Sequence, residues 1–249
     1  MKIAVISDIH GNYLALKAAL ADIRRQVVDE IVCLGDVVSN GPQPRLVVQR
    51  LKKITRRVVM GNADVELLET RSGKRELPED ASEFQRMLFD LDSWAVSQLR
   101  QADFAYLESF QEQVIIEVEE SVFMVCLHGS SRSNEEAMPA DAPDEKIEEL
   151  LEGREARLFA FGHTHTQMLR RFRSGILFNP GSVGLPYEVK WSGETRNIAR
   201  AEYALVTTRS GAVSVEFRQV PYSLRALRQT ARKSGMPHAE WWATEWEAG

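Results

Sequence analysis

The feature that most restricts the fold of this chain is a repeated order of apolar run, polar cluster and amphipathic stretch in its N-terminal quarter. The β-branched run of residues 2–6 predicts a buried strand, and residues 12–26 follow with leucines and alanines at helical spacing. The order recurs as a strand over 30–35 and a helix over 42–53, before a third strand over 56–62. Alternating strands and helices favour parallel pairing with right-handed crossovers, and therefore an α/β fold.

The pattern changes in the rest of the chain. Residues 64–111 are charged and helix-rich, and we expect a cap-like helical insertion on the core, because a strand pattern resumes directly after it. The polar segment 131–143 predicts a loop. Further strands are expected to be largely antiparallel, beginning with a hairpin over 113–129 and continuing at 156–163, 166–173, 175–181, 202–208 and 212–220. We interpret 1–249 as one domain with a C-terminal tail over 234–249.

Composition narrows the possible functions. The 249 residues are 44% hydrophobic, which suits one large domain, and the net charge of −5 gives no case for nonspecific nucleic-acid binding. Cys33 and Cys126 lie in apolar runs, so we expect free buried thiols. The N-terminal apolar run is too short for a signal peptide or a membrane span, which predicts a cytoplasmic protein without a membrane partner.

The tail contains three tryptophans, Trp241, Trp242 and Trp246. We expect them to pack on the chain's own surface, and a contact in an oligomer stays open as the alternative.

Polar clusters follow five of the predicted strands, and four of the five histidines lie in them. Because ligands of open α/β sheets bind beyond the carboxyl ends of the strands, these clusters should meet in space. Turn formation alone does not require histidine at strand ends. The clusters are SDIHGN (7–12), GDVVSNGP (35–42), GNAD (61–64), LHGS (127–130) and GHTH (162–165).

The residue types in these clusters match a pair of divalent metal ions. In a nearly extended segment, residues two apart point the same way, which pairs Asp8 with His10 and His163 with His165. The Asp36 carboxylate has one oxygen for each of two ions. Imidazole with carboxylate favours manganese, with iron, zinc, cobalt or nickel as alternatives, over calcium.

Taken in order, the clusters resemble the motifs of the calcineurin-like metallophosphoesterases: Asp-x-His, Gly-Asp, Gly-Asn, His-Gly and Gly-His-x-His. The match runs from residue 3 to about 184, and DIHGN and GDVVSNGPQP are similar to the small bacterial phosphodiesterase-like branch. The resemblance implies a four-layer α/β/β/α sandwich with mixed sheets and two metal ions at its edge. It implies one ion held by Asp8, His10, Asp36 and His165, and a second held by Asp36, Asn62, His128 and His163.

The predicted activity is hydrolysis of a small phosphoester, with a metal-bridging hydroxide as nucleophile and no covalent intermediate. Two divalent ions and two aspartates leave about two positive charges, which attract an anion. We name Asp36, His10 and Asn62 as catalytic residues. Many relatives carry histidine where this chain has Ala63, and Asp64 is either its substitute as proton donor or, as we favour, a helix cap.

The expected substrate contacts are Asn12 and Asn40. The phosphoprotein phosphatase branch carries an arginine near the position of Asn40, and an uncharged side chain suits a diester monoanion better than a monoester dianion. Arg132 could act as a clamp, although we favour a solvated loop arginine. A phosphomonoesterase acting on phosphoproteins or nucleotides, and a non-catalytic scaffold of the same fold, are the alternatives to a phosphodiesterase.

Overall fold

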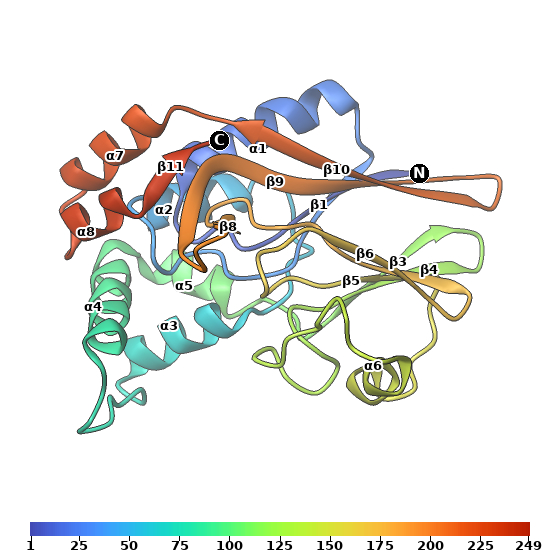
Figure 1. The fold of residues 1–249 in the computed structure, drawn as a ribbon, viewed down its shortest axis with the longest axis horizontal. Coiled ribbons are helices and arrows are strands. Elements are labelled where there is room, and N and C mark those ends of the chain that lie inside the picture. The colour runs from blue at the N-terminus through green and yellow to red at the C-terminus, as the bar shows by residue number, and fades with distance from the viewer.

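Two mixed β-sheets with helices on their outer faces make up the computed structural model, which describes residues 1–249 (Figure 1). The first sheet consists, in order, of β10 (Ala212–Pro221), β9 (Thr195–Arg209), β1 (Lys2–Ile6) and β2 (Glu30–Cys33), with β8 (Tyr187–Val189) and β11 (Trp246–Ala248) also paired to β9. The second sheet consists, in order, of β3 (Val114–Glu119), β4 (Val122–Cys126), β5 (Leu158–Ala160), β7 (Gly175–Asn179) and β6 (Met168–Phe172). The helices are α1 (Tyr13–Gln26), α2 (Pro44–Leu51), α3 (Asn62–Ser72), α4 (Glu83–Gln98), α5 (Gln101–Leu107), α6 (Asp144–Leu151), α7 (Leu224–Lys233) and α8 (Ala239–Thr244).

Strand directions agree with the sequence in part. β1 and β2 are parallel, and β3 and β4 form the predicted antiparallel hairpin. The second sheet is mixed, however, because β5 lies parallel to both β4 and β7. The connection from β4 to β5 passes through α6, and such a crossover brings the next strand back in the same direction. The expectation of a largely antiparallel second half is therefore wrong for β5.

The third predicted strand, over residues 56–62, is much shorter than expected. Only Val58 and Val59 pair with neighbours, as isolated bridges to Cys33 and Gln111. The chain leaves the sheet early because α3 already begins at Asn62, with Gly61 as its N-cap. The prediction of a full strand is wrong, although these two residues do extend the edge of the first sheet.

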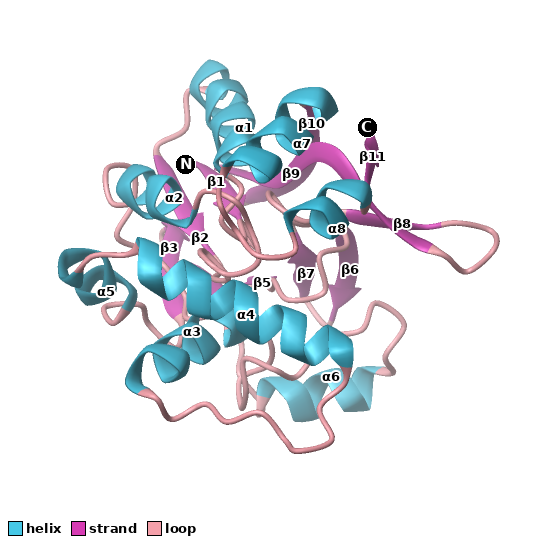
Figure 2. Ribbon diagram, turned by 90° about the vertical axis from the view of Figure 1, so that its left-hand side faces the viewer, coloured by secondary structure: helices cyan, strands magenta, loops and turns pink.

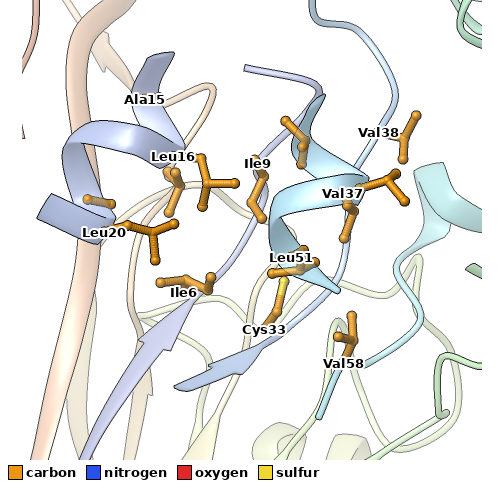
Figure 3. Packing of buried hydrophobic residues seen from close by; sticks show 14 of the residues in the cluster. Ile6, Ile9, Ala15, Leu16, Leu20, Cys33, Val37, Val38, Leu51 and Val58 are labelled. Atoms are coloured by element: carbon orange, nitrogen blue, oxygen red, sulfur yellow. The ribbon is translucent and has the colours of Figure 1, made fainter. Parts of the chain in front are cut away.

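The core has the layers that the sequence analysis predicted. Figure 3 shows side chains of α1 and α2, among them Leu16 and Leu51, packed over Ile6 and Cys33 of the first sheet. A second cluster fills the space between the sheets, and a third packs α6 against the outer face of the second sheet. The fold is therefore an α/β/β/α sandwich, since each sheet buries one face against the other sheet and one against helices.

The cysteines and the tail agree with the sequence predictions. Both cysteines are free and buried, as predicted. The tail folds back as α8 and β11, and buries Trp242 and Trp246 in one cluster with Leu91 of α4, which confirms packing on the chain's own surface. The helical segment 64–111 forms α3, α4 and α5, and none of the eight helices is long and apolar enough to span a membrane.

Candidate metal centre

The loops that follow β1, β2, Val59, β4 and β5 bring seven predicted ligand residues together at one edge of the sandwich. Within the first group, His10 Nε2 lies 3.1 Å from His165 Nε2 and 3.5 Å from Asp36 Oδ2. His165 Nε2 lies 3.5 Å from Asp8 Oδ1. One ligand atom from each of these four residues falls within 4.8 Å of all the others.

The second group adjoins the first through Asp36. Asn62 Oδ1 lies 3.0 Å from His128 Nε2 and 2.9 Å from His163 Nδ1. Asp36 Oδ2 lies 3.5 Å from His128 Nε2, the same distance as from His10 Nε2. The Asp36 carboxylate thus stands between the two groups, as the shared-ligand prediction requires.

The backbone at this site is unusual and explains how the side chains meet. Five of the seven residues have left-handed φ angles, between 46° and 66°: Asp8, His10, Asp36, His163 and His165. Non-glycine residues with this backbone conformation cost of order 1–3 kcal/mol each, and they cluster at functional sites. The expectation that the Asp8–His10 and His163–His165 pairs lie in extended segments is therefore wrong. The side chains converge because tight left-handed turns redirect them.

Backbone carbonyls fix the orientation of three histidine rings. The Nδ1–H groups of His10, His128 and His165 donate to the carbonyls of Ser39 (3.2 Å), Leu34 (2.7 Å) and Leu185 (2.9 Å). A carbonyl can only accept, so each Nδ1 carries the proton and each Nε2 presents a lone pair to the centre. Such a contact holds a metal-binding imidazole in the correct tautomer.

These tautomers leave lone pairs facing one another. The Nε2 atoms of His10 and His165 are 3.1 Å apart without a proton between them, and His128 Nε2 faces the Asn62 carbonyl oxygen in the same way. In addition, Asp8 Oδ2 is buried without a hydrogen-bond partner. Cations placed among these atoms would satisfy all of them, so the residues fit divalent metal ions.

Burial sets the charge states of the centre. Burial, with repulsion from His165, lowers the pKa of His10 to about 3, so its imidazole is neutral at pH 7. Burial and repulsion from Asp8 raise the pKa of Asp36. For Asp8 burial acts to raise the pKa, but attraction to His165, His128 and His10 outweighs it and lowers the pKa below its usual range. A bound cation would stabilise both carboxylates in their charged form.

Asp64 holds the loop that carries Asp36 in place. Its fully buried carboxylate accepts hydrogen bonds from the backbone amides of Asp36 (2.8 Å), Val37 (2.9 Å) and Gly61 (3.2 Å). The bond to Gly61 caps α3, as expected, although Asp64 is the third residue of that helix and not its N-cap. Because its oxygens face backbone amides, Asp64 does not replace the histidine that is missing at Ala63.

Two residues expected near the substrate have other contacts. Asn12 is fully buried as the N-cap of α1, and its side chain bonds to Ala15 N, Gly184 O and Tyr222 Oη. The prediction that Asn12 contacts substrate is wrong, since its polar atoms all serve the fold. Arg132 is paired with Glu136 (2.5 Å) and Glu149 (3.0 Å), which agrees with a loop arginine and not with a free clamp.

Asn40 does lie beside the centre. Its carbonyl accepts a 2.7 Å hydrogen bond from Trp242 Nε1, and the residue lines a cavity that His165 also lines. Its role in substrate binding stays a prediction.

Sequence reasoning missed the residues that hold the loops in place. In the segment after β7, Ser182 Oγ donates to the Asp8 carbonyl at 2.8 Å, and Asn179 Nδ2 donates to the Gly162 carbonyl at 2.6 Å. Gly61 is also essential to the geometry, because a Cβ there would lie 2.0 Å from Asp36 Oδ1. The polar sequence NPGSVG (179–184) was the available signal, since it follows a strand as the other clusters do.

Comparison with known proteins identifies the family. Residues 1–211 match the model of the calcineurin-like phosphoesterase superfamily domain. The chain belongs to this superfamily. The family and the four-layer fold predicted from the motifs are thereby confirmed, and the Asp and His cluster of this phosphoesterase is a candidate site for the metal on which the family depends.

Similar proteins cover nearly the whole length of this phosphoesterase. An uncharacterized protein of Methanocaldococcus jannaschii is 26% identical over 246 residues, which cover 96% of this chain and 94% of that protein. The structure of a metallophosphoesterase from Sphaerobacter thermophilus matches with a TM-score of 0.75 and 26% identity. The match covers 98% of this chain and 97% of the Sphaerobacter chain. A hypothetical protein from Pyrococcus horikoshii OT3 shares the fold, with a TM-score of 0.78 and 19% identity over 96% of each chain.

Proposed function

We propose that this chain is a phosphodiesterase that holds two divalent metal ions, manganese first among the candidates. The observation that carries the proposal is the position of Asp36 Oδ2, which is 3.5 Å from a histidine of each ligand group. Asp8, His10 and His165 would complete one site, and Asn62, His128 and His163 the other. When bound, such a pair of ions activates a water molecule and neutralises charge on the phosphoryl oxygens.

The chain's own residues prepare this chemistry before substrate binds. Carbonyl partners orient the imidazoles of His10, His128 and His165, so little reorganisation is needed at the moment of reaction. The low pKa of His10 keeps its lone pair available throughout the physiological pH range. The Asp64 carboxylate holds the Asp36 loop through three backbone amides.

The charge around the centre favours a diester over a monoester. A phosphomonoester dianion is usually held by a cationic clamp, and the arginine considered for that role, Arg132, is paired with two glutamates. Asn40 beside the centre is uncharged. A diester carries only one negative charge, and the metal ions suffice to match it.

The test is hydrolysis of bis-p-nitrophenyl phosphate by the purified protein with Mn²⁺, beside p-nitrophenyl phosphate as the monoester. We expect the diester to be the better substrate, and Asp36→Asn to lower its kcat/KM by on the order of 10²-fold or more. Asp80→Asn, at an exposed position, is the matched control and should retain full activity.

Three results would contradict the proposal. Full activity of Asp36→Asn would exclude a shared metal ligand at this position. A strong preference for the monoester would favour the phosphomonoesterase alternative. Stoichiometric metal binding without hydrolysis of either ester would favour a scaffold.

A further inference from the structure

A cavity of about 340 Å³ adjoins the candidate metal centre. His165 lines it on the side of the centre, and Tyr187 lies next to that ring, with 6.4 Å between the ring centroids. His10 of the metal centre also lies next to the His165 ring, with 4.9 Å between the ring centroids. Because His165 belongs to both, the cavity is within reach of an organic group of a phosphoester held at the metal centre.

Helix α4, strand β9 and the tail supply much of the cavity wall beyond the metal centre. Phe84 and Leu88 come from α4, Trp241 and Glu245 from the tail, and Asn197 from β9. Figure 2 shows α8 of the tail lying next to α4, and Phe84 meets Trp241 edge to face, with 6.1 Å between centroids. The hydrogen bond from Trp242 Nε1 to the Asn40 carbonyl attaches the tail to the loop that carries Asp36. Trp241 and Glu245 lie beyond residue 211, where the superfamily match ends.

The lining determines what the cavity can bind. Seven of its twelve residues are hydrophobic, several of them aromatic, which suits a flat apolar group. None of the twelve is lysine or arginine, and the single charged side chain is Glu245, so a second phosphate would be repelled. The remaining polar residues, among them Asn197 and Thr195, offer hydrogen bonds to a heterocycle with polar edges.

We propose that this cavity binds a nucleobase of the substrate, which makes the substrate a nucleoside phosphodiester. This inference rests on the proposed function, because the cavity leads from the same centre. The base stacks against the aromatic side chains of the wall, Trp241 foremost, and its polar edge meets the uncharged polar residues. The tail and α4 are therefore the parts of the fold that determine specificity.

The test measures binding first, because binding does not depend on turnover. Adenosine 5′-monophosphate, ribose 5-phosphate and phenyl phosphate are titrated calorimetrically into the Mn²⁺-loaded protein. We expect the nucleotide to bind about 10-fold or more tightly than ribose 5-phosphate, which is the scale of one base stacked on an aromatic side chain. Trp241→Ala should remove this difference and leave the affinity for ribose 5-phosphate unchanged.

Two further variants are included, one as a control outside the cavity and one at a second residue of the cavity wall. Trp191→Ala is the matched control, because Trp191 is fully exposed and is not part of the cavity, and it should bind as the wild type does. Phe84→Ala, at a residue that is 54% exposed, removes one wall without touching the buried cluster of the tail. We expect it to weaken nucleotide binding in the same direction as Trp241→Ala.

The proposal is overturned if ribose 5-phosphate binds as tightly as the nucleotide, or if Trp241→Ala and Phe84→Ala leave the ratio unchanged. Equal affinity for phenyl phosphate and the nucleotide would also overturn it, since the cavity would then recognise any aromatic group. A kinetic comparison separates this failure from that of the proposed function. If the base preference is found but neither p-nitrophenyl thymidine 5′-phosphate nor methyl p-nitrophenyl phosphate is hydrolysed, the nucleobase site stands and the phosphodiesterase does not.

Discussion

Gly61→Ala tests the geometry of the centre with a single methyl group. Gly61 has φ −84° and ψ 166°, an extended conformation that alanine adopts without strain, so the substitution acts through space alone. A Cβ built at this position lies 2.0 Å from Asp36 Oδ1 and 2.5 Å from Asp36 N. The Asp36 carboxylate must therefore move.

The size of that movement sets the expected effect. Ordinary van der Waals contact begins near 3.4 Å, so Oδ1 must withdraw by more than an ångström. Oδ2 of the same carboxylate is 3.5 Å from both His10 Nε2 and His128 Nε2, and it cannot keep both distances. A displacement of about 1 Å at a reacting centre costs on the order of 10²-fold in rate. We expect a loss of that order in kcat/KM for bis-p-nitrophenyl phosphate, with Mn²⁺ affinity lower by about 10- to 100-fold.

The assay combines calorimetric titration of Mn²⁺ with steady-state kinetics. Gly73→Ala is the control, because Gly73 ends α3 in a left-handed conformation with no atom near its would-be Cβ. It should destabilise the fold by about 1–2 kcal/mol without changing metal affinity. Unchanged Mn²⁺ binding in Gly61→Ala would refute the placement of Asp36 between the two ligand groups.

Three more predictions concern the scaffold around the centre. Burial acts to raise the pKa of Asp22, but hydrogen bonds from Tyr203 and Arg218 outweigh burial and lower the pKa. The Asp22 carboxylate therefore stabilises the fold above pH 3.8. This stabilisation is lost as the pH falls through the pKa of Asp22 in the folded state. Asp22→Asn should be less stable than wild type at pH 7 in urea unfolding. If the difference in free energy of unfolding between the two proteins does not narrow in acid, the stabilising role of the Asp22 carboxylate is contradicted. Asn12→Ala should cost about 1–3 kcal/mol in the same assay while KM for the diester stays within about twofold, whereas a raised KM at unchanged stability would restore Asn12 as a substrate contact. Trp246→Ala, at a fully buried residue of the tail, should cost about 3–5 kcal/mol, and a loss below about 1 kcal/mol would mean that the tail is not part of the folded core.

The position of the centre could be predicted from sequence because strand ends are readable. Each polar cluster follows an apolar run, and strands of one sandwich edge end close together, so Asp8, Asp36 and His128 could be assigned to one place. The local geometry could not be predicted. Aspartate and histidine with left-handed φ are uncommon, and no periodicity signals them, which is why an extended arrangement of His163 and His165 was the wrong expectation.

Single polar residues at helix starts were the least predictable. Asn12 and Asp64 each occupy a position where a side chain can cap a helix, bind a ligand or hold a neighbouring loop, and sequence offers no means of deciding among these. The structure assigns Asn12 to capping and Asp64 to the amides of Asp36 and Val37. The cavity wall could not be predicted from sequence either, because Phe84 and Trp241 meet only through the packing of the tail on α4.

The most direct test of the account is anomalous diffraction at the manganese edge, from crystals of the protein grown with Mn²⁺. We predict two peaks about 3.5–4 Å apart, with Asp8, His10 and His165 around one, Asn62, His128 and His163 around the other, and Asp36 in contact with both. A single peak, or peaks away from these side chains, would contradict the claim that this cluster holds a pair of metal ions.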